Sequence, residues 1–126
     1  MTVEARQLAI ESLYEADQRE LSEPGDGLPA RVERMVRGVL THQPMLDEEI
    51  DAVSTHWRIN RMPVVDRAIL RLAVYELLHE PVTPPGVVVS EAVRLAKLFG
   101  TEKSGAFVNG ILGTLVAKLV SKREKG

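Results

Sequence analysis

The chain has 126 residues, of which 44% are hydrophobic and 27% charged, with a formal net charge of −2 and no cysteine. This composition predicts a single globular domain over residues 1–126, and it excludes a disordered chain, disulfide bonds and thiolate chemistry. No apolar run approaches the roughly 20 residues that span a bilayer, and no signal-peptide pattern opens the chain, so we expect a cytoplasmic protein without membrane contact.

The charges are unevenly distributed along the chain. Residues 1–30 carry two arginines and seven acids, whereas residues 90–126 carry seven Lys or Arg and three acids. Such asymmetry permits an anionic ligand near the C-terminal end. The favoured alternative is a solvated last helix whose basic residues complement the helix dipole. It applies to the basic residues of the tail, which are Lys118, Lys122, Arg123 and Lys125.

Helical spacing of apolar residues predicts three helices in the first half of the chain. The first covers about residues 3–20 and ends at turn-forming residues 22–27. A second helix is predicted from Pro29 to about His42, and a third over about 45–56. Gln43 and Pro44 are expected to separate them, because proline removes a backbone donor and disfavours the helix before it.

Residues 64–78 form the most informative segment, a nearly uninterrupted apolar helix that begins after Pro63. A helix without a broad polar face cannot lie on a surface, so it must be the central helix of a bundle. Three prolines within residues 80–86 end it. Two further helices follow, one ending at Gly100 and one of heptad-like pattern over about 104–120. The predicted class is all-α.

The residues needed for catalysis are not grouped in this sequence. His42, His56 and His79 do not form a metal-ligand motif, and neither a serine-nucleophile elbow nor a glycine-rich phosphate loop occurs. We therefore expect no catalytic site, no metal and no cofactor.

Several motifs in register resemble the NusB family of bacterial transcription antitermination factors. After Trp57, these are RMPVVDRAILR at 61–71, YELL at 75–78, SEAVRLAK at 90–97 and FVNGIL at 107–112, with a weaker match at 5–16. The resemblance implies an all-helical bundle of about six to seven helices, arranged as two three-helix sub-bundles.

The resemblance also implies a function without catalysis. NusB-like proteins bind boxA-type single-stranded RNA of ribosomal-RNA leader transcripts, together with NusE, a protein of the small ribosomal subunit. The pair helps RNA polymerase pass terminators, and the family also forms homodimers. NusB proteins usually open with an arginine-rich arm, whereas residues 1–6 of this chain contain a single basic residue, Arg6. The alternative is therefore a protein-interaction scaffold or homodimer with weakened or lost RNA binding.

Four residues are candidates for RNA binding. Arg6 and Tyr14, two turns apart on the first helix, are expected on one face, where arginine can pair with phosphate and tyrosine can stack on a base. Lys103 and Phe107, at the start of the last helix, match the family's RNA and partner surface. Tyr14 as a boundary residue of the core is an equally favoured alternative, and Phe107 as plain core is slightly favoured.

Three residues of the central helix are candidates for contact with NusE. Asp66 falls at a position that faces the partner in the family, and Arg67 and Arg71 project together one turn apart. For Arg71, an intrachain salt bridge is at least as favoured. Glu76 is embedded among apolar residues and is expected to need a buried partner. Trp57 is expected to fill the seam between the sub-bundles.

Overall fold

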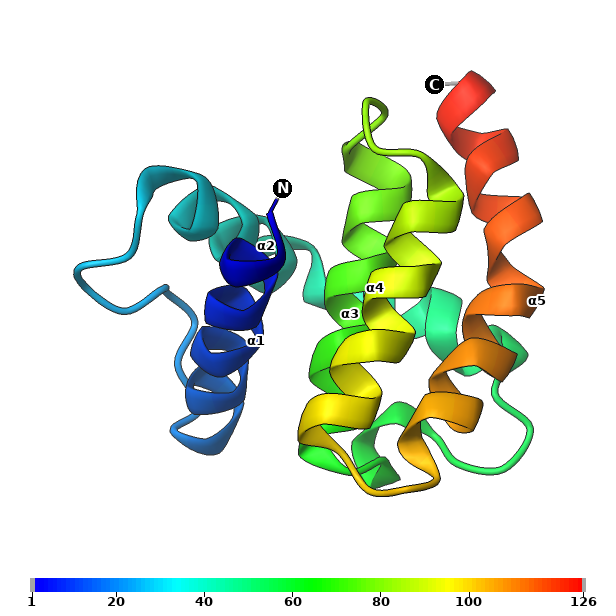
Figure 1. Cartoon of the computed structure of the whole chain (residues 1–126), viewed down its shortest axis with the longest axis horizontal. Coiled ribbons are helices and arrows are strands. Elements are labelled where there is room, and N and C mark those ends of the chain that lie inside the picture. The colour runs from blue at the N-terminus through cyan, green and yellow to red at the C-terminus, as the bar shows by residue number, and fades with distance from the viewer. Residues whose placement is uncertain (1, 126) are drawn as a thin grey trace.

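The computed structural model describes the backbone of residues 2–125 and the side chains of residues 2–122. Across this part of the chain there are five α-helices, one short 3-10 helix and no strand (Figure 1). The elements are α1 (Val3–Gln18), α2 (Ala30–Val53), η1 (Ile59–Arg61), α3 (Val64–His79), α4 (Pro85–Phe99) and α5 (Ser104–Lys125). The prediction of an all-α fold is confirmed.

Helix α3 lies at the centre of the bundle, as its apolar sequence predicts. All residues from Ala68 to Leu77 are buried. Helix α1 and the first part of α2 pack on one side of α3, and α4 and α5 pack on the other (Figure 1). Helix α2 crosses behind α3, so that its C-terminal part reaches α5, and one core lies between all five α-helices.

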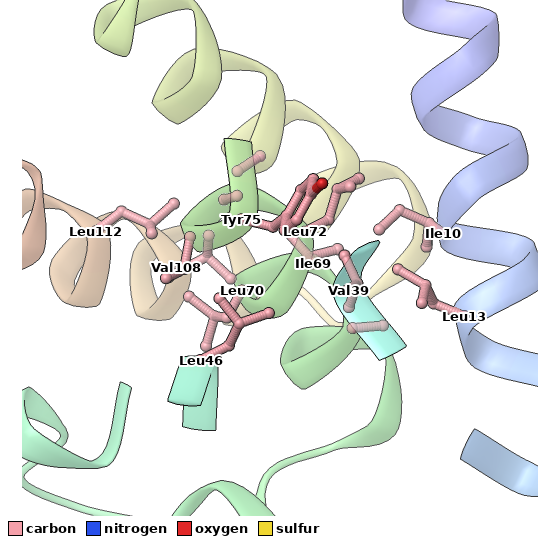
Figure 2. Close-up of a cluster of buried hydrophobic side chains, with 14 of the residues drawn as sticks. Ile10, Leu13, Val39, Leu46, Ile69, Leu70, Leu72, Tyr75, Val108 and Leu112 are labelled. Carbon is pink, nitrogen blue, oxygen red and sulfur yellow. The ribbon is translucent and has the colours of Figure 1, made fainter. Parts of the chain in front are cut away.

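Two neighbouring side chains of α3 pack against α1 and α2. Figure 2 shows Ile69 extending toward Val39 of α2 and Ile10 of α1, and Leu70 lying next to Leu46 of α2. These residues belong to one buried cluster. Burial of each such side chain stabilises the fold by about 1.5–3 kcal/mol, so α3 contributes much of the hydrophobic free energy.

Helix α2 corrects one prediction from the sequence. It continues through Pro44 from Ala30 to Val53, where two helices separated at residues 43–44 were expected. An interior proline removes a helical hydrogen bond and costs about 3 kcal/mol. Val39 before the proline and Leu46 after it are both fully buried, and burying both halves of α2 against the same core offsets that cost. The described chain accordingly has five α-helices rather than six or seven.

Helix α5 corrects the expectation that no apolar segment is long enough to span a bilayer. Its segment Ser104–Lys122 is long and apolar enough to span a membrane by length and composition, with a mean hydropathy of 1.3. Val108, Leu112, Leu115 and Leu119 are, however, fully buried inside the bundle. The apolar character of α5 therefore comes from its place in the core.

Candidate nucleic-acid interface

Arg6 lies inside the bundle, where it joins three helices. The residue is 3% exposed, and its side chain donates two hydrogen bonds to Glu76 of α3, from Nε at 3.1 Å and from Nη2 at 2.8 Å. Its Nη1 also lies 3.9 Å from Oε1 of Glu91 on α4. The expected buried partner of Glu76 is thus Arg6. A contact between Arg6 and an RNA phosphate would require the guanidinium to leave this bidentate pair.

Tyr14 lies on the outer surface of α1 and is 43% exposed. Arg6, eight residues before it on the same helix, is instead buried against α3. The two side chains therefore do not form one accessible surface. The tyrosine is accessible to a base, whereas the arginine is not.

Trp57 and Phe107 form an aromatic pair at the surface near the start of α5. Their ring centroids are 5.5 Å apart and the ring planes are tilted by 57°. Phe107 packs partly against the core, while Trp57 is 47% exposed. Lys103 is exposed one turn before Phe107. The structure thus brings Lys103 and Phe107 together at one end of α5 and adds Trp57 to them.

The position of Trp57 corrects the expectation that it fills the seam between the sub-bundles. Ile59 and Met62, which follow it in the chain, are buried in the core instead. The hydroxyl of Ser54 donates a hydrogen bond to the carbonyl of Trp57, and the N–H of Ile59 donates to Asp51 at 2.7 Å. These bonds fold residues 54–58 so that isoleucine points inward and tryptophan outward. The nearby apolar residues 59 and 62 were the sequence signal that tryptophan was not needed in the core.

A groove adjoins the aromatic pair, between the end of α2 and the first half of α5. Its volume is about 420 Å³. One wall consists of residues 53–56, and the α5 wall carries mainly small side chains, including Ala106, Gly110 and Thr114, beside Phe107. The groove therefore has both an aromatic edge and room for a planar group.

Asp66 lies at the start of α3 and is directed toward α5 rather than into solvent. It is 3% exposed and accepts a hydrogen bond from the hydroxyl of Ser104 at 2.8 Å. Burial raises the pKa of Asp66, and the hydrogen bond from Ser104 only partly opposes this effect. Asp66 thus connects the first turns of two helices beneath the surface that carries Lys103.

Arg67 and Arg71 form a network with two aspartates. Arg67 donates two hydrogen bonds to Asp17 of α1, each 2.7 Å long. Arg71 donates to Asp47 of α2 at 2.8 and 3.0 Å and to Asp17 at 3.4 Å. The hydrogen bonds from Arg67 are the main reason that the pKa of Asp17 lies below its ordinary value. The intrachain salt bridge that the sequence analysis gave as the alternative for Arg71 is therefore present.

Two basic residues near the C-terminal end also have an intrachain partner. Lys118 and Lys122 of α5 pair with Glu49 of α2; Glu49 Oε2 lies 3.1 Å from Lys118 Nζ, without hydrogen-bond geometry. Burial alone would raise the pKa of Glu49, but the two lysines outweigh it and the pKa is lowered. The side chains of Arg123 and Lys125 lie outside the described residues.

Comparison with known proteins supports the motif-based resemblance. The sequence model of the NusB family matches residues 3–117. The chain belongs to the NusB family.

Relatives named transcription antitermination protein NusB cover most of the chain. The protein of Anaeromyxobacter sp. (strain Fw109-5) is 40% identical over 96% of this chain and 93% of its own length. That of Arthrobacter sp. (strain FB24) is 44% identical over 88% of this chain and 89% of its own length.

Solved NusB structures have the same fold. The T. maritima NusB structure aligns with a TM-score of 0.84 and 31% identity, over 98% of this chain and 96% of that chain. A structure of NusB and NusE in complex with dsRNA aligns with a TM-score of 0.75 and 29% identity, over 90% of this chain and 94% of that chain.

Within this NusB fold, the residues singled out from the sequence fall into two classes. Arg6, Asp66, Arg67 and Arg71 bind other residues of the chain. Tyr14, Lys103 and Phe107 remain wholly or partly accessible. The accessible group contains the chemistry that single-stranded RNA recognition uses, which is aromatic rings and a cation.

Proposed function

We propose that this protein is a transcription antitermination factor that binds boxA-type single-stranded RNA of ribosomal-RNA leader transcripts together with NusE. It acts by assembling a protein–RNA complex with RNA polymerase in the cytoplasm, without catalysing a reaction. The observation that carries the RNA and NusE parts of this proposal is the likeness, over 90% of the chain, to a NusB solved with NusE and dsRNA.

The RNA-binding surface that we propose has two accessible parts. At the start of α5, Lys103 pairs with a phosphate and the ring of Phe107 contacts a base. On α1, Tyr14 offers a second ring. Arg6 acts behind this surface, because its pair with Glu76 fixes α1 against α3. Loss of a cation reduces both the affinity for RNA and its salt dependence.

For NusE we propose the surface over the first turns of α3 and the adjoining ends of α1 and α2. Arg67 and Arg71 act there by holding α3 to α1 and α2, and Asp66 acts by holding α3 to α5, since each already has an intrachain partner. A partner protein then contacts a surface whose shape is fixed before binding, which lowers the entropy lost on association.

The test is fluorescence anisotropy of a labelled boxA-type RNA titrated with this protein, with and without NusE, at two salt concentrations. We expect NusE to tighten binding and higher salt to weaken it. A mutated boxA sequence serves as the control. Equal or absent binding to both RNAs, with or without NusE, contradicts the proposal. Self-association that is independent of RNA, measured by analytical ultracentrifugation, would then support the scaffold or homodimer alternative.

A further inference from the structure

The exposed indole of Trp57 is held in a defined position. The chain contains one tryptophan, and a buried tryptophan would remove about 150–250 Å² from water. Nearly half of this side chain nevertheless stays exposed, although residues 54–59 are tied down by the hydrogen bonds of Ser54 and Asp51. A large aromatic surface is therefore presented to solvent on an ordered segment.

Phe107 connects Trp57 to the groove beside it. It contacts the Trp57 ring and also lines the groove of about 420 Å³. That volume falls within the roughly 300–1,000 Å³ of small-molecule sites. On the α5 wall, a methyl group added at Gly110 would meet nothing within 4 Å, so there is open space next to Gly110. A planar ring can therefore enter beside the aromatic pair.

Exposed basic residues adjoin the aromatic pair along the chain. The side chain of Arg58, next to Trp57, is 73% exposed and approaches Asp51 only to 4.0 Å. Arg61 and Lys103 are also exposed, and the acid nearest to Lys103 in sequence is Glu102. Exposed cations directly next to Trp57 and one turn before Phe107 favour a ligand that combines flat rings with negative charge, as a single-stranded nucleic acid does.

We propose that Trp57 and the adjoining groove bind one unpaired base of the RNA, with the indole as its stacking surface. This inference rests on the proposed function and extends it to a residue outside the four RNA-binding candidates. Trp57 stacks on the base, Phe107 supports the indole from the side, and Arg58 and Lys103 face the flanking phosphates. The small residues of the α5 wall leave space for the edge of the base.

The first experiment measures the affinity of NusE-bound protein for labelled boxA-type RNA by anisotropy. Base–aromatic stacking predicts that Trp57→Ala binds roughly 5- to 150-fold more weakly. Trp57→Phe keeps a ring and should retain most of the affinity. Thermal unfolding followed by circular dichroism checks that both variants fold.

A matched pair of glycine variants tests the groove independently of Trp57. Gly110 lines this groove, whereas Gly113 lines the separate groove between α4 and α5. A Cβ at either position meets nothing within 4 Å, so both alanine variants should fold normally. We expect Gly110→Ala to weaken RNA binding and Gly113→Ala to leave it unchanged.

Tryptophan emission gives a direct readout of stacking. Since Trp57 is the sole tryptophan of this chain, the difference in emission between wild type and Trp57→Phe reports this residue even when NusE is present. We expect unlabelled RNA to quench that difference signal.

The possible outcomes separate this inference from the proposed function. If the wild type binds RNA and Trp57→Ala binds it with the same affinity, the role of Trp57 is overturned and the proposed function is retained. Weaker binding of NusE by Trp57→Ala without RNA would instead assign the surface to a protein contact. Failure of the wild type to bind RNA would remove both.

Discussion

Charged and aromatic residues are used differently in two regions of this protein. Where neighbouring helices pack against α3, Arg6, Arg67 and Arg71 are largely buried and pair with carboxylates of the same chain. At the start of α5, Trp57 and Lys103 are directed into solvent. The comparison teaches that arginine in a family motif need not be the residue that meets the ligand. Charges paired within the chain fix the packing of the helices, and accessible rings and cations remain for binding.

The largest expected effect comes from breaking the buried Arg6–Glu76 pair. Arg6→Ala leaves the carboxylate of Glu76 without its bidentate partner and should destabilise the protein by about 3–5 kcal/mol. Urea unfolding measures this change. Replacing both residues, as in Arg6→Met with Glu76→Leu, should recover much of the loss. Arg19→Ala, at an exposed pair with Glu15, should change stability by less than about 0.5 kcal/mol. Equal effects of Arg6→Ala and Arg19→Ala would contradict this comparison.

A smaller effect is expected where α2 and α3 approach closely. A Cβ at Gly38 would lie 2.3 Å from ring atoms of Tyr75, so Gly38→Ala forces the tyrosine or the helix to move. Such overpacking costs about 1–3 kcal/mol, more than the helix propensity gained by alanine. Thermal unfolding should show a lower Tm. Gly113→Ala, which meets open space, is the control, and an unchanged Tm for both variants would show that Tyr75 moves freely.

The ion pairs of Asp17 predict a pH dependence of stability. Because the folded-state pKa of Asp17 is lowered, its ionised form stabilises the fold above the unfolded pKa of about 3.9, and that stability is lost as pH falls through the folded value. Urea unfolding of wild type and Asp17→Asn should therefore differ most at neutral pH and converge in acid. A constant difference down to about pH 3 would mean that the ion pairs contribute nothing.

The contribution of Asp66 to the pH dependence of stability should have the opposite sign. Its folded-state pKa is raised, so ionisation opposes folding as pH rises through that value. Asp66→Asn keeps an acceptor for Ser104 without the buried charge. We expect this variant to be as stable as wild type, or slightly more stable, at neutral pH. A marked loss of stability would show that the charge itself is needed.

The smallest expected effect sharpens the binding side of the comparison. Lys103→Gln should leave the unfolding midpoint unchanged, because the side chain is exposed. It should weaken binding to boxA-type and mutated RNA alike and lower the slope of log affinity against log salt by about one. Anisotropy titrations over a range of salt concentrations measure the slope. A change for one RNA only would indicate base recognition instead of a phosphate contact.

The sequence predicted the central helix and the end of α4, because each depends on residues that are close together in the chain. The apolar run at 64–78 could be satisfied only at the centre of a bundle, and Gly100 ends α4 as predicted. The buried partner required by Glu76 followed from the same reasoning, although its identity as Arg6 did not. Pro44 was misread, because its local preference for a break is overridden by the burial of residues on both sides.

By itself, the sequence determined the helical class, the central place of α3 and the family motifs, because each depends on residue order within one or two helices. The tertiary structure decided which polar side chains are available for binding. That choice depends on contacts between residues far apart in the chain, such as Arg6 with Glu76 and Trp57 with Phe107. A charge is expensive to bury unless a partner meets it, and only the packing of helices shows where the partner lies.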